Sequence, residues 1–473
     1  MKNKNYFLFL SFFLFASTSF SQAISKLELP HSEVALDEGA FWFRKWELNQ
    51  PAGVSLRSIT NFDSGLLMTF SGSDFAYLNQ QKATSFKSIA PSQYEWQYSD
   101  ANLDYKRTYQ VEGETILVDV SIQFKQKSPD RGFLSLVARG LKEDPEARDR
   151  EIFYFTDSKI ERKSVGKTIE PTEIATPVKW VGAGSRYFIF TVIPTGVPAE
   201  KLLIQSTGEN SGQASLQFPV LNHALNTKFK VVFAPKQLDL LRSIDKSLDT
   251  TVNLGFFTFL AYPILWALKY IYKFVGNYGL AIIILTIFIK ILTFPLVLKS
   301  MKGMRKMAEF QPKMKALQEK HKDNKVALNQ EMMVLMKSSG YNPMGGCLPM
   351  LIQMPIFFAL YSVLYAAVEL YHAPFVFWIT DLSAKDPFFI TPVLMALIMF
   401  LQQKLTPPSP GMDPSQRKVM MFMPLIFGAF MITTPAGLCV YMVVNASVSI
   451  LQQQYLNKKL GIPGHASGMA TSF

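Results

Sequence analysis

Residues 278–298 (YGLAIIILTIFIKILTFPLVL) decide how the rest of the chain is interpreted. The stretch is apolar apart from Lys290 and its polar neighbours, and at about 1.5 Å per residue a helix of this length crosses a hydrocarbon core of about 30 Å. It therefore predicts a membrane protein. A lysine near the middle of a span costs at least about 2.5 kcal/mol, so Lys290 is expected to face water or a bundle interior and to mark a functional site.

Two threonines lie on the same helix face as this lysine. Thr286 comes four residues before Lys290 and Thr293 three residues after it, so the three side chains form a polar stripe. Such a stripe needs a hydrophilic partner. The alternative is a lysine that snorkels to the membrane surface, but Lys290 lies about 18 Å along the helix from Tyr278, which is too deep for easy escape.

Composition divides the chain into two parts. Long uncharged runs occur at the extreme N-terminus and after residue 253, and both cysteines, Cys347 and Cys439, fall in the second of these regions. Residues 24–250 contain no cysteine, so no disulfide framework is expected there. The net charge of +12 comes largely from cations beside the hydrophobic runs. That placement indicates membrane orientation and attraction to anionic lipid, and we expect no readout of nucleic acid.

The N-terminus has the order of a secretory signal. Lys2 and Lys4 precede an apolar core, and small and polar residues follow up to Ala23. Residues 1–23 are therefore expected to be a cleaved signal peptide or a retained N-terminal signal anchor. In either case the chain from residue 24 onward begins on the outer face of the membrane.

Residues 24–250 predict an exported, antiparallel β-sandwich. Alternating segments such as 115–124 (TILVDVSIQF), 187–194 (YFIFTVIP) and 228–233 (KFKVVF) are separated by Gly, Ser, Asn and Pro clusters. No catalytic constellation, metal-ligand cluster or Gly-rich phosphate loop stands out, so we expect no enzyme, metal or cofactor. A carbohydrate-binding or carbohydrate-processing module stays open as an alternative, since it would need paired carboxylates or an aromatic platform that sequence cannot locate.

The charge distribution sets the expected membrane topology. The segment 299–337 holds ten Lys and Arg against four acidic residues, which places it in the cytoplasm. This orientation requires residues 251–275, a run broken by Pro263, to lie along the outer interface as an amphipathic helix. Residues 276–460 then form an α-helical membrane domain of five spans, with a cytoplasmic helical hairpin and a cytoplasmic tail. The expected spans are about 278–298, 347–368, 388–403, 419–432 and 437–455, with the hairpin at 299–340 and the tail at 461–473.

Polar residues on other spans can line a cavity shared with Lys290. Gln353 lies on the second expected span, and Tyr441 and Asn445 lie four residues apart on the last, followed at helical spacing by Ser449 and Gln452. The plainer interpretation is hydrogen bonding between helices, which is worth only about 0.6 kcal/mol per bond on average. No acidic residue lies deep in any span, which disfavours a proton-relay transporter.

The cytoplasmic hairpin carries an apolar stripe. Met304, Met307, Phe310 and Met314 follow roughly heptad spacing, and 19 of the 21 methionines lie after residue 300. Flexible thioethers suit a surface that accepts many apolar partners, so the stripe predicts a capture surface for an emerging chain. The alternative is that methionine merely fills gaps in the bundle.

Four stretches together resemble a known family. They are 276–296 (GNYGLAIIILTIFIKILTFPL), 342–361 (NPMGGCLPMLIQMPIFFALY), 373–395 (APFVFWITDLSAKDPFFITPVLM) and 436–454 (AGLCVYMVVNASVSILQQQ), and in this order they are similar to the YidC membrane protein insertases of the YidC/Oxa/Alb family. The exported domain adds the architecture of the Gram-negative bacterial members. The resemblance implies a multi-pass protein of the bacterial inner membrane, with residues 24–250 in the periplasm and the C-terminus in the cytoplasm.

The resemblance also implies a mechanism and partners. In this family a hydrophilic groove receives the polar end of an incoming protein without ATP or catalytic chemistry, and Lys290 occupies the position of the groove cation, usually an arginine. Thr286 and Gln353 match family positions, whereas Met442 stands where close relatives carry a tyrosine. The implied partners are nascent membrane proteins and lipoproteins, the lipid bilayer, and the Sec translocon, ribosome or signal recognition pathway.

A small-solute transporter or channel centred on Lys290 is the runner-up from another class. It would show internal repeats, paired broken helices or a charged partner in another span, and the sequence displays none of these.

Overall fold

The computed structural model places the strands and helices between residues 24 and 460. The description that follows is limited to these parts of the chain: 24–28, 32–37, 43–48, 65–70, 84–126, 128–139, 150–156, 159–165, 168–175, 177–208, 211–321, 344–405, 414–460 and isolated helical residues between 326 and 334. The expected signal segment 1–23 and tail 461–473 lie outside these ranges. Side chains of residues 300–315 and 344–352 are also outside the description.

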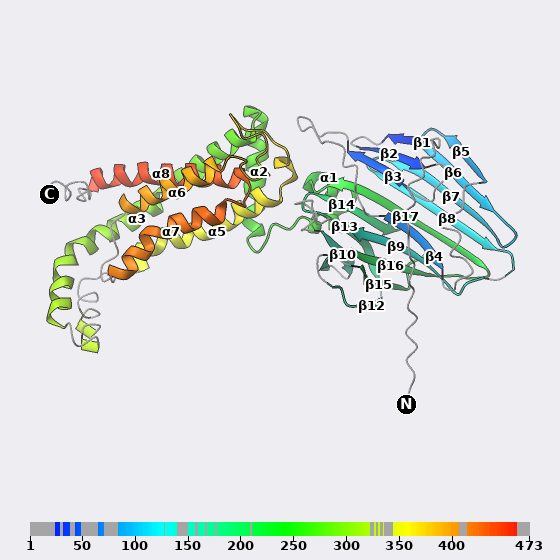
Figure 1. The fold of residues 1–473 in the computed structure, drawn as a ribbon, viewed down its shortest axis with the longest axis horizontal. Helices are drawn as coiled ribbons and strands as arrows, with labels where there is room; N and C mark the ends of the chain where they lie inside the picture. The colour runs from blue at the N-terminus through cyan, green and yellow to red at the C-terminus, as the bar shows by residue number, and fades with distance from the viewer. Residues whose placement is uncertain are drawn as a thin grey trace.

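The exported part consists of antiparallel β-sheets (Figure 1). A small sheet joins β1 (Ile24–Glu28), β2 (Ser32–Asp37) and β3 (Phe43–Leu48). A five-stranded sheet has the order β12 (Thr172–Ala175), β15 (Lys201–Gly208), β16 (Ser211–Pro219), β9 (Arg131–Arg139) and β4 (Gly65–Phe70). The nine-stranded sheet has the order β11 (Lys159–Ser164), β10 (Glu151–Thr156), β13 (Val178–Gly184), β14 (Phe188–Pro194), β17 (Ala224–Pro235), β8 (Thr115–Phe124), β7 (Leu103–Glu112), β6 (Gln93–Ser99) and β5 (Ser85–Ala90).

The two larger sheets pack on one another through the alternating residues of their strands. In β8, Val118, Val120 and Ile122 are fully buried, while the residues between them point outward. They share one core with residues of the five-stranded sheet such as Leu202 and Leu216. The predicted antiparallel β-sandwich is confirmed for this region.

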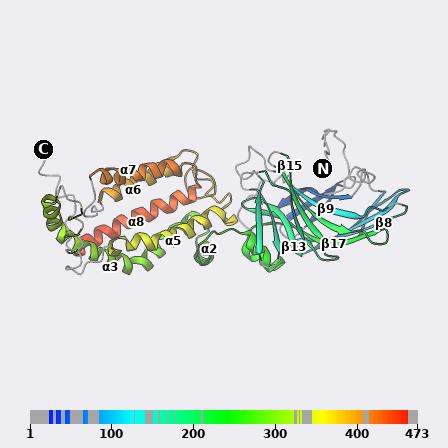
Figure 2. The ribbon, with the colours of Figure 1, turned by 90° about the horizontal axis from the view of Figure 1, so that it is seen from below.

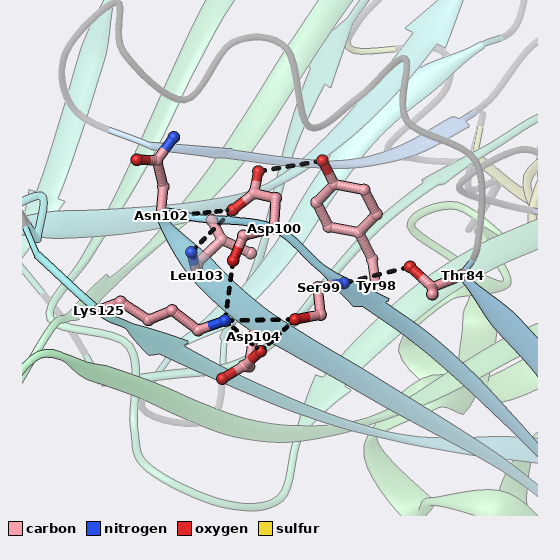
Figure 3. A network of polar contacts seen from close by, with 8 residues as sticks. All are labelled: Thr84, Tyr98, Ser99, Asp100, Asn102, Leu103, Asp104 and Lys125. Carbon is pink, nitrogen blue, oxygen red and sulfur yellow. Dashed lines mark hydrogen bonds and ion pairs between the residues drawn. The ribbon is translucent and has the colours of Figure 1, made fainter.

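A polar network closes the hairpin between β6 and β7 (Figure 3). The Asp100 carboxylate accepts hydrogen bonds from the backbone N–H of Asn102 and Leu103 at 2.7 and 2.9 Å. Lys125 Nζ lies 2.9 Å from Asp104 Oδ1 and donates to the Asp100 carbonyl at 2.8 Å. These hydrogen bonds and the ion pair stabilise the turn that connects the ends of β6 and β7.

The second part of the chain is helical and lies beside one end of the β-domain (Figures 1 and 2). Its elements are α1 (Leu238–Ile244), η3 (Lys246–Thr251), α2 (Thr258–Val275), α3 (Tyr278–Lys320), α5 (Met344–Ala366), η4 (Val368–Leu370), α6 (Ile390–Leu405), α7 (Pro414–Met431) and α8 (Ala436–Leu460). Among the described helices, Tyr278–Lys299 and Ala436–Lys459 are long and apolar enough to cross a membrane. Gln353–Ala366, Ile390–Leu405 and Val419–Met431 are shorter apolar helices, so the number of five spans stays a prediction.

Helix α3 continues well beyond the expected first span. It runs unbroken for 43 residues to Lys320, because the basic segment after residue 298 is rich in Lys, Met, Ala and Glu, all of which favour helix. The expected boundary at 298/299 is therefore not a break in the helix. Glu331 lies 3.5 Å from Lys320 and 3.1 Å from His321, which links the end of α3 to the segment that follows.

The segment between η4 and α6 forms a structure that we call the outer cap, residues 371–389. Asp386 organises it: its carboxylate accepts hydrogen bonds from Thr391 N–H and Oγ1 at 2.7 and 2.8 Å, from Phe388 N–H at 3.0 Å and from Trp378 Nε1 at 3.1 Å. The cap also packs against α3 at Gly279, where a Cβ atom would clash with the Phe375 ring. It therefore ties the starts of α3 and α6 together.

Truncating a core ring of the β-domain should destabilise it strongly. Phe229 is fully buried between the sheets, and we expect Phe229→Ala to lower the free energy of unfolding of the β-domain by about 3–5 kcal/mol. Leu221→Ala is the control, because Leu221 is 63% exposed and should change stability little. Chemical unfolding of both variants followed by tryptophan fluorescence checks this, and equal losses would contradict the assigned core.

The outer cap should lose stability in acid. Burial by itself raises the pKa of the Asp386 carboxyl, but the hydrogen bonds from Thr391, Phe388 and Trp378 outweigh burial and hold the pKa below its ordinary value. The carboxylate therefore stabilises the fold fully above the ordinary Asp pKa and loses this effect as the pH falls through the lowered pKa. We expect Asp386→Asn to lower the free energy of unfolding by about 1–3 kcal/mol near neutral pH. In thermal unfolding, the difference in stability between this variant and wild type should become smaller towards about pH 3. A gap independent of pH would contradict this role.

Candidate functional site

Lys290 lies at the junction of α3 and α8. Its side chain is only 7% exposed, and its Nζ donates a hydrogen bond to Ser449 Oγ at 2.8 Å. Gln452, on the same face of α8, donates from Nε2 to the backbone carbonyl of Lys290 at 3.1 Å. Both the charge and the backbone of Lys290 are thus bound by one neighbouring helix.

The helical period explains why this lysine points inward. Thr286, one turn earlier on the same face, is 2% exposed, whereas Ile291, about 100° further around the helix, is 65% exposed. The hydroxyls of Thr286 and Thr293 donate to the carbonyls of Ile282 and Ile289 within α3, at 2.6 and 2.9 Å. They line the same face as Lys290, but their hydroxyl protons are used inside the helix.

A second junction joins α8 to α5. Gln353 Nε2 donates to Tyr441 Oη at 3.1 Å, and the Tyr441 side chain is 1% exposed. Asn445 lies between the two junctions on α8, where its backbone carbonyl accepts a hydrogen bond from Ser449 Oγ at 2.7 Å. We call the residues Tyr441, Asn445, Ser449 and Gln452 the polar seam of α8, since they follow helical spacing and meet both α5 and α3.

The structure brings some of the sequence-predicted residues together, and their role in a groove stays a prediction. Gln353 contacts Tyr441, and the contacts to Lys290 come from Ser449 and Gln452, which the sequence named only as neighbours in the same polar row. The sequence contains a signal for Ser449 and Gln452, because both continue the helical spacing of polar residues that begins at Tyr441. Met304, Met307, Phe310 and Met314 lie on the backbone of α3, but their side chains fall outside the described residues.

The chemistry of the site is that of a cation and neutral polar groups. Within the described ranges, no carboxylate forms an ion pair with Lys290, and no group of three or more His, Cys, Asp and Glu side chains is arranged for a metal. Glu369, between α5 and α6, lies 3.6 Å from Lys269 and not against Lys290. A lysine held only by a hydroxyl keeps its capacity to attract an anionic group.

Two tryptophans of the exported domain belong to its core. Trp96 and Trp180 are 1% and 0% exposed, which excludes both as members of an open aromatic platform for sugars. Trp180 packs edge-on against Phe153 at 5.8 Å between ring centroids.

Comparison with known proteins gives matches to both parts of the chain. The family described as YidC periplasmic domain matches residues 62–267, and the family described as 60Kd inner membrane protein matches residues 270–462. Together they cover both the β-domain and the helical part.

Individual relatives carry the same name. The chain is 43% identical over 323 residues to "Membrane protein insertase YidC" of Syntrophus aciditrophicus, covering 67% of this chain and 59% of the relative. It is 35% identical over 395 residues to the protein of that name from Geotalea uraniireducens, covering 81% of this chain and 72% of the relative. The first of these alignments thus spans little more than half of the relative's length. The solved structure of an active YidC insertase aligns with 92% of this chain and 93% of its own at 17% identity and a TM-score of 0.41, which is too low to add support.

Burial should protect Lys290 from chemical modification. Lys299 lies nine residues later on α3 and is exposed, so it serves as an internal control. We expect a water-soluble amine-acylating reagent to label Lys299 in the detergent-solubilised protein and to label Lys290 slowly. Ser449→Ala removes the hydroxyl that binds the amine and should speed labelling of Lys290 alone, as measured by mass spectrometry of the peptides. Equal labelling of the two lysines in wild type would contradict the buried position.

Proposed function

Because the chain belongs to the YidC family of membrane protein insertases, we propose that it assists the insertion, folding and assembly of proteins in the inner membrane. The family pairs a periplasmic domain with an inner-membrane part, and its matches cover both. Membrane proteins are the substrates that the family name implies, and the bilayer is their destination. The observation that carries the proposal is the buried Lys290, which is 7% exposed and donates to Ser449 on the polar seam of α8.

The proposed site is a hydrophilic groove next to Lys290. A polar or acidic segment of the incoming protein is attracted by the ammonium group, which a desolvated environment screens weakly. Thr293, Gln353 and Asn445, which are partly exposed, offer neutral polar surface along its way, and the buried Thr286 and Tyr441 lie behind them. Since Ser449 already accepts one hydrogen bond from Lys290, an acidic group would compete with a weak neutral acceptor.

Release into the bilayer requires no cofactor or catalytic group in this proposal. An apolar segment of about 20 residues gains free energy by leaving the groove for lipid, at roughly 25 cal/mol per Å² of apolar surface. The hydrogen bonds at Lys290 hold the bundle in place while the segment moves out. Partition of the substrate, and not a chemical reaction, drives the proposed activity.

Topology and partners complete the proposal. We place the C-terminus and the segment 299–340 in the cytoplasm, where the methionine stripe meets the emerging chain, and α2 along the outer interface. On the exposed face of α2, Trp266, Tyr270 and Phe274 are 67%, 50% and 73% exposed, which suits headgroup depth. Lipoproteins, the Sec translocon, the ribosome and the signal recognition pathway are proposed partners on the strength of the resemblance alone.

The family match supports the insertase over a transporter or channel centred on Lys290. A transporter also needs a charged counterpart in the path, and within the described ranges Lys290 has none.

Insertion by the purified chain tests the proposal. The protein is reconstituted alone in liposomes with a small single-span substrate that has an acidic translocated tail, and insertion is scored by protease protection. We expect wild type and Lys290→Arg to protect the tail, since both carry a cation, and Lys290→Ala to reduce protection about tenfold, which corresponds to about 1.4 kcal/mol of lost attraction.

Lys299→Ala is the matched control, because it removes an exposed cation from the same helix and should leave protection unchanged. Full protection by Lys290→Ala would remove the charge from the mechanism. Absence of protection in every sample would contradict an autonomous insertase.

A further inference from the structure

Arg186 of the β-domain contacts the C-terminal end of α5. Arg186 lies in the turn between β13 and β14, and its guanidinium stacks on the ring of Tyr365 with Cζ 3.8 Å from the ring centroid. Its NH2 group also donates to Tyr365 Oη at 2.5 Å. Stacking and a hydrogen bond on the same ring fix both its position and its orientation.

The two residues after Arg186 extend this contact. Tyr187 and Phe188, which are 2% and 1% exposed, pack on the ring of Tyr371 with centroid distances of 4.8 and 5.5 Å. Tyr365 and Tyr371 lie on either side of the end of α5 at Ala366. The β13–β14 strands and their turn therefore contact the last turn of α5 at Tyr365 and the segment after it at Tyr371.

A single stripe on α5 connects this contact with the polar site. Gln353, Phe357, Tyr361 and Tyr365 are spaced four residues apart, so successive side chains are neighbours in a row that winds by about 120° around the helix. The rings of Phe357 and Tyr361 are 6.3 Å apart, and those of Tyr361 and Tyr365 are stacked at 5.7 Å. At the inner end of the stripe, Gln353 donates to Tyr441 on α8.

We propose that Arg186 is a positioning residue for the membrane site: by fixing Tyr365 it sets the rotation of α5, and thereby brings Gln353 to Tyr441. Residues 355–365 are continuous helix and turn as a nearly rigid rod, so the orientation set at Tyr365 is transmitted over almost three turns to Pro355, two residues from Gln353. The exported domain thus acts on the polar seam of α8 without approaching it. The consequence for insertion rests on the proposed function, but the coupling itself does not.

Other contacts to α5 do not replace Arg186. Phe257, just before α2, stacks on Phe358 at 6.1 Å, and Gly255 approaches Ser362. Neither of these contacts involves the Tyr365 ring, although Phe358 lies seven residues before Tyr365 and therefore on nearly the same face of α5. Leu360, Val363 and Leu364 are buried in the core of the helical part, so loss of Arg186 would leave α5 packed in place but would remove the contact that orients the Tyr365 ring.

Hydrogen exchange of the full-length protein in detergent measures the coupling directly. We expect Arg186→Ala to speed exchange of the amides in 353–366 about threefold or more, and Arg186→Lys, which keeps a cation over the ring, to give a smaller change. Lys228→Ala is the matched control, because Lys228 belongs to an exposed ion pair with Asp119 in the same sheet and should leave α5 unchanged. Unchanged exchange in Arg186→Ala would overturn the proposal, and so would an increase of the same size throughout β14 and β17, since that reports a loss of the fold.

Insertion then tests whether Arg186 acts through Gln353. In the liposome assay, Arg186→Ala and Gln353→Ala should each reduce protection of the substrate tail. The double variant should protect the tail as well as the more impaired of the two single variants. Effects that multiply would overturn the assigned route. If the wild-type protein inserts nothing, the proposed function fails, while the exchange measurement still decides the coupling.

Discussion

The bond between Lys290 and Ser449 is the interaction on which the membrane part depends. An ammonium group inside an apolar bundle is unfavourable unless neighbouring groups accept its hydrogen bonds, and here the Ser449 hydroxyl on α8 accepts one. The same helix binds the Lys290 carbonyl through Gln452, so α3 and α8 are joined at both the side chain and the backbone. Around this junction the outward face of α3 is left apolar, as the exposed Ile291 and Leu292 show.

The contacts outside the spans orient the helices that meet at this junction. The outer cap binds α3 and α6 through Asn277, Gly279 and Asp386, and the β13–β14 turn holds the end of α5. Helix α8 joins the cap at its first turn, where Gly437 N–H donates to the Leu382 carbonyl at 2.9 Å. The polar contacts of the site thus lie within a frame that is fixed at the outer ends of its helices.

Local patterns in the sequence predict much of this architecture. The alternation in residues 115–124 appears as β8, and the apolar run around Lys290 as the outer half of α3, because period and length determine such elements. Contacts between helices are less accessible to sequence, since spacing indicates a shared face but not the partner opposite. For this reason the spacing puts Thr286 and Thr293 beside Lys290 although their hydroxyls bind their own helix, and it marks Ser449 as polar without indicating that Ser449 binds the Lys290 amine. The contact between Arg186 and Tyr365 joins residues 179 positions apart, and no local sequence pattern predicts it.

The central claim is that an incoming polar segment meets the Lys290 side of the bundle and not its lipid-facing side. A photo-crosslinking residue is placed at Asn445, on the polar seam, or at Ile291, which is 65% exposed and lies about 100° around α3 from Lys290. Each variant is then presented with a stalled nascent chain whose translocated segment is acidic. The account predicts adducts with the acidic segment from position 445 and none from position 291. Adducts of that segment from position 291 alone would contradict it.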